Sequence, residues 1–166
     1  MAELSWFRDE KANFDTEDTE IIGISAGEPV TTVPDFLFVY GTLMRGLPLH
    51  RLIAGRSEFV GTGTVKGNLL DLGHYPGAVP DRPGTVHGEV YRLLSRGLLE
   101  TLDQEEEYRP DAPSQSLYVR RPAAVCLADG REVTAWVYWF QGPRGRAVPI
   151  PGGDYRQHLP ARVFLR

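Results

Sequence analysis

The chain of 166 residues has a single cysteine, Cys126, so it cannot form an internal disulfide. This shortage is typical of proteins that work in a reducing compartment. No apolar run follows a basic start, and no apolar stretch approaches the roughly 20 residues that a membrane-spanning helix needs. These absences exclude a disulfide-stapled scaffold and predict a cytoplasmic protein without a membrane segment.

The chain also lacks an excess of basic over acidic residues. The net charge is −4, and residues 1–34 hold eight acids against two bases, which leaves the rest of the chain at about +2. That excess is too small for the basic stripe that nucleic-acid binding requires, so we expect no nucleic-acid partner. The run from Phe14 to Glu20 is acidic and has little apolar surface to bury. We therefore predict an acidic, flexible N-terminal arm over residues 1–34 and one domain over residues 35–166.

The domain is rich in short strand patterns separated by glycine and proline. Strands are predicted at residues 36–40, 58–65, 67–72, 85–93, 117–127 and 132–140, with helices at 47–55, 96–106 and 154–159. Asp129-Gly130 between the last two strands is a strong hairpin signal. About six or seven strands with one long helix and two short ones predict a barrel or sandwich of the α+β class.

The first strand ends abruptly in Tyr40-Gly41-Thr42. A glycine here lets the backbone take a positive φ or approach a ligand closely. The backbone N–H groups beyond such a turn can form a nest that binds an anion or oxyanion. On this stretch alone, an ordinary turn after a buried strand is the favoured interpretation.

The helix over residues 96–106, which we expect Ser95 to cap, has a leucine stripe and ends in three consecutive glutamates. At 100° per residue the stripe is centred near about 50°, with Glu106 at about 80°, Glu105 at about −20° and Glu107 at about 180°. Only Glu106 lies within the stripe. Burial and the negative helix end would raise its pKa toward that of a general base near neutral pH. If the helix frays before Glu105, all three glutamates are solvated instead.

Other constellations are weaker candidates. The four histidines have no close spacing and no paired cysteines, so a zinc site is not expected. No Gly-x-Ser-x-Gly elbow supports a hydrolase triad. The glycines of residues 61–67 lack the spacing of a dinucleotide loop and indicate sheet curvature. Cys126 is expected to be an inert core thiol. A hydrolase that pairs Glu106 with Glu89 remains open.

Four segments together resemble the γ-glutamylcyclotransferase-like (AIG2-like) family. They are similar to its Tyr-Gly-Ser/Thr-Leu, Leu-Asp-x-x-Glu, Tyr-x-Arg and Gly-Asp-Trp motifs, in that order. In this chain the segments are Tyr40-Gly41-Thr42-Leu43, Leu102-Asp103-Gln104-Glu105-Glu106, Tyr118-Val119-Arg120 and Gly153-Asp154-Tyr155. The resemblance covers residues 36–159, and the threonine of the first segment is most similar to the γ-glutamylamine cyclotransferase branch.

The resemblance implies a fold, a reaction and a site. The fold is a small mixed β-barrel with a few short flanking helices. In the reaction, the α-amine of a γ-glutamyl amide attacks its own side-chain carbonyl, which gives 5-oxoproline and a free amine without a cofactor or metal. Glu106 corresponds to the general acid/base, and Tyr40, Gly41, Thr42 and Leu43 to the substrate-binding turn.

The chain departs from the family pattern in two places. The family usually has glycine after the catalytic glutamate, where this chain has Glu107, and the acidic arm is extra. Either departure is compatible with the alternative of a non-catalytic small-molecule-binding or interaction protein on the same scaffold. The leaving amine and the oligomeric state are left open.

Overall fold

The computed structural model describes residues 33–159, so the predicted acidic arm lies outside the described residues except for its last two positions. The strands are β1 (Phe36–Val39), β2 (Ser57–Lys66), β3 (Asn68–Asp71), β4 (Pro76–Val79), β5 (Thr85–Leu93), β6 (Tyr118–Leu127), β7 (Glu132–Phe140) and β8 (Val148–Pro149). The helices are α2 (Gly97–Glu105) and α3 (Tyr155–His158), with short 3-10 turns η1 (His50–Leu52), η2 (Pro113–Gln115) and η3 (Pro151–Gly153).

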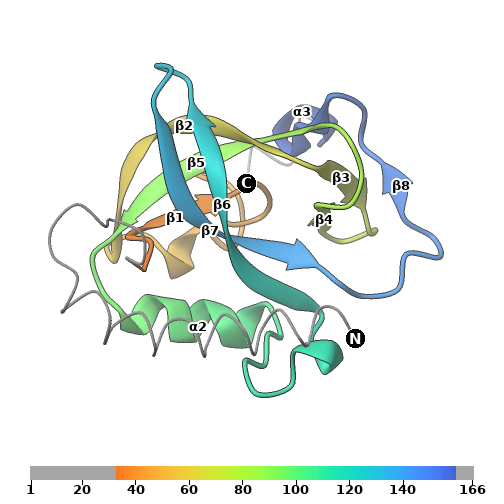
Figure 1. Cartoon of the computed structure of the whole chain (residues 1–166), viewed down its shortest axis with the longest axis horizontal. Coiled ribbons are helices and arrows are strands. Elements are labelled where there is room, and N and C mark those ends of the chain that lie inside the picture. The colour runs from red at the N-terminus through yellow and green to blue at the C-terminus, as the bar shows by residue number, and fades with distance from the viewer. Residues whose placement is uncertain (1–32, 160–166) are drawn as a thin grey trace, which may run out of the picture.

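Five strands close into a barrel. Their order is β1-β5-β2-β6-β7, and β1 closes the ring because it pairs antiparallel with β5 and parallel with β7. The remaining strands extend the sheet from β7 in the order β4-β3-β8. In Figure 1, α2 lies along one side of the barrel, while β3, β4, β8 and α3 lie together on another side. The predicted α+β class and mixed barrel are confirmed.

Glycine curves β2, as the sequence indicates. The register between β2 and β5 shifts between Phe59 and Gly61, which marks a β-bulge. A Cβ at Gly63 would lie only 2.9 Å from the carbonyl oxygen of Cys126 on β6. The absence of a side chain at Gly63 therefore lets β2 and β6 approach each other and close the ring.

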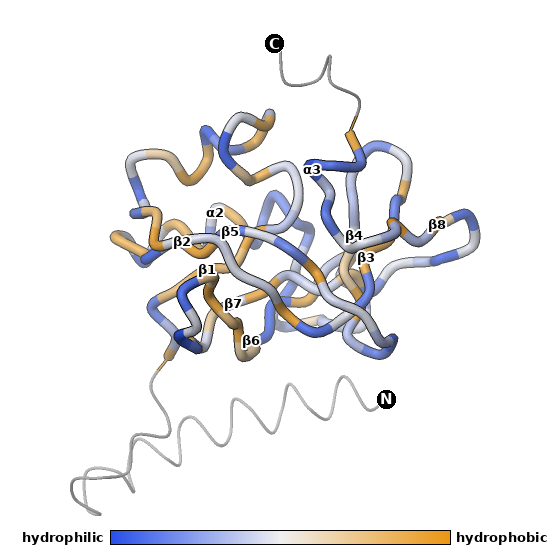
Figure 2. Tube along the Cα trace, turned by 90° about the horizontal axis from the view of Figure 1, so that it is seen from above, coloured by the Kyte–Doolittle hydropathy of each residue, from blue (hydrophilic) through white to orange (hydrophobic). Residues whose placement is uncertain are grey.

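The core is continuous and has β1 and β7 at its centre. β7 is buried at every position from Ala135 to Phe140, as is typical of a strand with both faces covered. Figure 2 shows hydrophobic stretches along β1 and β7. The neighbouring strands add Val86 and Val90 of β5, which pairs with β1, and Val125 of β6, which pairs with β7, all fully buried.

Three predictions about local structure are wrong. Residues 47–55 form only the short turn η1, because the chain turns at both ends of this segment, where Gly46 and Gly55 have φ of 81° and 80°. Strand β4 lies within a segment predicted as a loop; it is held by pairing with β3 and by Ala78 beside Trp139 of β7. Cys126 is exposed on β6 and is not a core residue.

Among residues 33–159, no helix has the length and apolar character needed to cross a membrane.

Candidate active site

Tyr40 follows β1, and two neighbouring strands hold its ring. Its hydroxyl donates a hydrogen bond to the carbonyl oxygen of Tyr138 on β7 (2.6 Å) and accepts one from the backbone N–H of Ala78 on β4 (3.1 Å). Burial raises the pKa of Tyr40 far above its usual value, so the hydroxyl stays protonated. Tyr40 therefore anchors the start of the turn to the barrel wall.

The turn after Tyr40 lines a pocket and has backbone donors without acceptors. Within the described residues, the N–H groups of Gly41, Thr42 and Leu43 have no hydrogen-bond acceptor, and all three residues line one cavity. Their carbonyl groups hold the shape of the turn, since Gly41 accepts from Met44 N–H (3.0 Å) and Thr42 from Leu49 N–H (2.9 Å). Consecutive unpaired donors of this kind suit an anion or a developing oxyanion.

Gly41 is needed for packing and not for a left-handed backbone. Its φ is not among the positive values, so of the two roles that the sequence leaves open for this glycine, a positive φ is excluded. A Cβ at this position would lie 2.8 Å from Cγ of Pro76 on β4. A larger residue would push the turn away from the wall on which it rests.

Helix α2 buries the predicted leucine stripe, with Leu98 and Leu102 fully inaccessible. Its start differs from the prediction: Arg96 is the N-cap residue, and no side chain caps the helix, so Ser95 is not the cap. The apolar face of α2 therefore fixes the helix on the barrel without help from a capping side chain.

The C-terminal end of α2 is a Schellman motif with Glu106 at the C-cap. The N–H of Glu107 donates to Gln104 O (3.2 Å), and the N–H of Tyr108 donates to Asp103 O (2.8 Å). Glu107 takes the left-handed conformation, with φ of 53°, at the position that usually favours glycine. Glutamate at this position is therefore compatible with the Schellman motif, although glycine usually occupies it.

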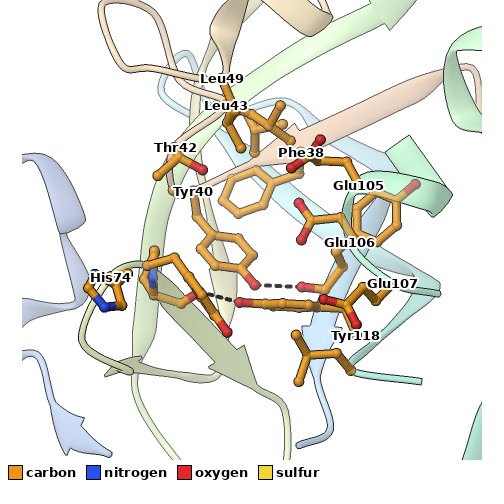
Figure 3. Close-up of a pocket in the computed structure, with 16 residues that line it drawn as sticks. Phe38, Tyr40, Thr42, Leu43, Leu49, His74, Glu105, Glu106, Glu107 and Tyr118 are labelled. Carbon is orange, nitrogen blue, oxygen red and sulfur yellow. Dashed lines mark hydrogen bonds between the residues drawn. The ribbon is translucent and has the colours of Figure 1, made fainter. Parts of the chain in front are cut away.

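The three glutamates at this end point in different directions. Glu105 and Glu107 are exposed, whereas Glu106 is half-buried as a residue and its carboxyl group is surrounded by protein. Burial, and to a smaller extent the charge of Glu105, raises the pKa of Glu106 to about 8. Figure 3 shows the Glu106 side chain directed toward Tyr40. The alternative of a frayed helix with three solvated glutamates is therefore wrong.

A buried ion pair holds this end of α2 against the barrel. The guanidinium of Arg120 on β6 donates two hydrogen bonds to the Asp103 carboxylate, from Nε (2.8 Å) and Nη2 (3.0 Å). The Tyr138 hydroxyl donates a third to Asp103 Oδ1 (2.6 Å). Because Asp103 lies one turn before Glu106 on the helix, this network also sets the position of Glu106.

One cavity of about 270 Å³ brings the turn and the glutamate together. The sequence places them in the same site, and the structure places both on the walls of this cavity (Figure 3). The remaining walls are mainly aromatic. Among the lining residues are Phe38, Leu49, His74, Tyr75, Pro76, Leu117, Tyr118 and Tyr138. A small polar substrate would thus meet backbone donors on one side and a largely buried carboxyl group on another.

Glu89 is buried outside this cavity, which overturns the pairing of Glu106 with Glu89. Its Oε1 accepts hydrogen bonds from the Tyr91 hydroxyl (2.9 Å) and the Arg45 N–H (3.0 Å), and its Oε2 accepts one from Arg156 Nη2 (3.1 Å). These contacts join the loop after β1 to β5 and α3. Glu89 is therefore a structural anchor for that loop.

Comparison with known proteins shows the family to which the chain belongs. The model of the family described as "Gamma-glutamyl cyclotransferase, AIG2-like" matches residues 37–157. The chain belongs to this family. The matched residues include the turn after β1, the end of α2 and the Asp103–Arg120 pair.

Similar proteins include two from bacteria and one solved structure. YtfP of Citrobacter rodentium, a γ-glutamylcyclotransferase family protein, is 42% identical over 72% of this chain and 93% of its own. A γ-L-glutamyl-butirosin B γ-glutamyl cyclotransferase of Niallia circulans is 31% identical over 74% of this chain and 76% of its own. The crystal structure of the mouse AIG2-like protein aligns with 68% of this chain and 82% of its own, at 29% identity and a TM-score of 0.55. These names support a γ-glutamyl cyclotransferase enzyme.

Several residues of this family member's pocket were not predicted. Tyr118 lines the cavity and donates a hydrogen bond to Pro76 O (2.7 Å), and Tyr138 lines it beside Asp103. Tyr118 belongs to the Tyr-x-Arg segment, and strand alternation places it on the same face as Arg120. That alternation was a usable signal for Tyr118. His74 and Tyr75 lie in the segment predicted as a loop and gave no such signal.

Proposed function

We propose that this protein cyclises a γ-glutamyl amide or γ-glutamylamine to 5-oxoproline and releases an amine or amino acid, with Glu106 as the general acid/base. The observation that carries the proposal is the Glu106 carboxyl group, with a pKa raised to about 8, on the same cavity as the unpaired N–H groups of Gly41, Thr42 and Leu43. A base with a pKa near the working pH suits proton transfer.

The reaction needs one proton carrier and one anion site. The carboxylate of Glu106 removes a proton from the substrate α-ammonium, and the free amine attacks the side-chain carbonyl carbon. The carbonyl oxygen becomes negative, and backbone N–H donors of the turn stabilise it. Glu106 then gives its proton to the leaving nitrogen as the C–N bond breaks. The attacking nitrogen loses its second proton to Glu106 as the lactam forms, and this proton passes to the released amine, so the ionised form of Glu106 is restored and no cofactor is consumed.

Substrate folding supplies part of the rate. The attacking amine and the carbonyl belong to one molecule. A pocket that holds the γ-glutamyl chain in a bent shape keeps these two groups close together, which lowers the entropic cost of ring closure. The cavity of about 270 Å³ suits one such small group. The same turn of Tyr40, Gly41, Thr42 and Leu43 is a candidate site for the substrate α-carboxylate.

The γ-glutamylamine branch is part of the proposal. Its supports are the threonine at position 42 and the Niallia circulans relative, whose name gives a γ-glutamyl derivative of butirosin B as its substrate. The non-catalytic alternative gains no support from Glu107, because the left-handed backbone there leaves the Schellman motif intact.

Replacement of Glu106 tests the assignment. Glu106→Gln keeps the size of the side chain but cannot accept the proton, so we expect 5-oxoproline release to fall at least 10²-fold. Circular dichroism should show an unchanged fold. Glu100→Gln, on the exposed part of the same helix, is the matched control and should keep activity. Full activity in the Glu106 variant would show that the base is another group, and stabilisation by γ-glutamyl amides without any turnover would favour a binding protein.

A further inference from the structure

The last of the four segments that resemble the family motifs, Gly153-Asp154-Tyr155, fixes helix α3 against the barrel. Asp154 is the N-cap residue, and its carboxylate accepts a hydrogen bond from the N–H of Arg156 (3.0 Å). Tyr155 is buried in the core. A Cβ at Gly153 would overlap the carbonyl oxygen of Thr85 on β5, so the missing side chain lets this segment approach the barrel closely. The position of α3 is therefore set by the motif.

Arg156 joins α3 to the turn after β1. Its Nη2 group donates hydrogen bonds to the carbonyl oxygen of Arg45 (2.8 Å) and to Oε2 of Glu89 (3.1 Å). Oε1 of Glu89 accepts a hydrogen bond from the N–H of Arg45 (3.0 Å). The Glu89 side chain is only 7% exposed, so its charge is little screened by water. Both backbone polar groups of Arg45 are thus held by the Arg156–Glu89 pair.

Holding Arg45 fixes the backbone donors of the pocket. The turn is a tight unit, because the N–H of Met44 donates to the carbonyl oxygen of Gly41 (3.0 Å). Nδ1 of His50 forms a hydrogen bond with the carbonyl oxygen of Leu43 (2.9 Å). With Arg45 held at its end, the turn cannot rotate as a unit, and its unpaired N–H groups keep their direction.

His158 joins α3 to a second wall of the pocket. Its Nε2 forms a hydrogen bond with Oδ2 of Asp71 at the end of β3 (2.7 Å), and Oδ1 of Asp71 accepts one from the N–H of Gly73 (2.8 Å). These bonds, with that of His158 the stronger influence, lower the pKa of Asp71, so it stays a carboxylate. The loop between β3 and β4 carries His74 and Tyr75, which line the cavity. Through Asp71, α3 therefore also holds this loop.

Helix α3 lies outside the pocket that it braces. None of its four residues, all within the described part of the chain, lines the cavity. In Figure 1, α3 lies near β3 on a side of the barrel away from α2. Figure 3 shows Thr42 of the turn and His74 of the loop on one side of the pocket and Glu106 on the other. The two segments held by α3 thus face the end of α2.

We propose that α3 is a clamp for the pocket, with Arg156 as the positioning residue of the turn and His158 as that of the loop between β3 and β4. Arg156 acts through Glu89 and the backbone of Arg45, and His158 acts through Asp71. Neither side chain touches the substrate. The effect of the clamp on turnover rests on the proposed cyclisation, in which the turn stabilises the developing negative charge; its effect on the backbone does not.

NMR of the purified full chain tests the first arm of the clamp without a substrate. Arg156→Met keeps an aliphatic stem but loses both hydrogen bonds of the guanidinium, so the amide resonances of Gly41, Thr42 and Leu43 should shift or broaden. Gln157→Ala, at an exposed position of the same helix, is the matched control and should leave them in place. Unchanged turn resonances in Arg156→Met would overturn the role given to Arg156.

The same spectra test the second arm. His158→Leu removes the hydrogen bond to Asp71, so the amide resonances of His74 and Tyr75 should shift. Gln157→Ala should again have no effect. If the loop resonances stay in place in His158→Leu, the loop is held without α3 and this arm of the proposal is wrong.

Kinetics test whether positioning of the turn matters for the reaction. Displacing a positioning group by about 1 Å can lower a rate on the order of 10²-fold, and the turn keeps its other hydrogen bonds, so we expect Arg156→Met to lower kcat/KM about tenfold. Arg156→Lys, which retains a cationic donor, should recover part of this loss, and Gln157→Ala should lose nothing. The assays are run at a temperature at which circular dichroism shows every variant folded. A lower melting temperature with unchanged kcat/KM would reduce Arg156 to a purely structural residue.

A double variant tests the route through Glu89. Because Arg156 and Glu89 act through one contact, Arg156→Met combined with Glu89→Gln should lower kcat/KM by less than the product of the two single losses. Losses that multiply in full would show that the two residues act separately.

The two readouts separate this inference from the proposed reaction. If the wild type turns over no γ-glutamyl amide and the turn resonances still move in Arg156→Met, the cyclisation is wrong and the clamp stands. If the wild type forms 5-oxoproline and Arg156→Met changes neither the resonances nor kcat/KM, the cyclisation stands and the clamp is wrong. Resonances that move while kcat/KM stays constant would overturn the link between the clamp and the reaction.

Discussion

Arg120 and Asp103 form a buried ion pair whose exposed counterpart in the same barrel is Arg131 with Asp129. In both pairs the arginine Nε lies 2.8 Å from a carboxylate oxygen. The side chains of the first pair are 16% and 12% exposed, and those of the second are 65% and 55% exposed. Because the two distances are equal and the burial differs, the pairs show how burial changes the contribution of an ion pair to stability.

Removal of Arg120 should destabilise the protein strongly. Arg120→Met leaves the Asp103 charge buried without its cation, and we expect the free energy of unfolding to fall by about 3 kcal/mol. Turnover should fall as well, because Asp103 no longer holds the end of α2 that carries Glu106. Arg131→Met, the exposed control, should cost less than about 1 kcal/mol. Urea unfolding measures both, and equal losses in the two variants would contradict the role given to the buried pair.

The pH dependence of kcat/KM should reflect the raised pKa of Glu106. Activity is expected to rise with pH as Glu106 loses its proton, with a midpoint near pH 8. The charge of Glu105 contributes to the raised pKa, so Glu105→Gln should move the midpoint to lower pH. Glu100→Gln should leave it in place. A midpoint that is unaffected by Glu105→Gln would show that another group governs the profile.

Glu106 should reduce stability in alkaline solution. Its pKa is raised from 4.5 to about 8 on folding, so between these values the folded protein holds a proton that the unfolded chain has lost. Stability from this group is therefore present below pH 4.5 and is lost as pH rises through about 8. Glu106→Gln has no such loss and should exceed the wild type at pH 9 by on the order of 2 kcal/mol. Thermal melts from pH 5 to pH 9 measure this, and a constant difference between the two proteins would argue against a buried carboxyl group.

The left-handed backbone at Glu107 should respond to glycine. Glu107→Gly relieves the steric cost of φ at 53°, and we expect a gain of about 1 kcal/mol after the larger entropy of the unfolded glycine is included. Glu107→Gln removes the charge but keeps the Cβ, so it should show no comparable gain. Denaturant unfolding of the two variants distinguishes backbone from charge. A glycine variant less stable than the wild type would mean that the Glu107 side chain makes a stabilising contact.

Local patterns in the sequence identified the elements that depend on near neighbours. The leucine stripe of α2 oriented Glu106 inward, and Asp129-Gly130 marked the hairpin between β6 and β7, because both features follow from spacing along the chain. Strand β4 was missed because Pro76-Gly77-Ala78-Val79 has no strand alternation. It forms since Gly77 packs against Phe140, where a Cβ would lie 2.6 Å away, and this contact exists only in the folded barrel.

By itself, the sequence determined the fold class and the inward direction of Glu106, and it named candidate site residues through their resemblance to the family motifs. Tertiary structure alone decided that Gly41 packs on Pro76, that Asp103 is locked by Arg120 and Tyr138, and that Glu89 lies outside the pocket. The physical reason is barrel closure. Pairing of β1 with both β5 and β7 brings the turn after β1 to the cavity wall beside a helix end about 65 residues later, and no local pattern in the chain records that proximity.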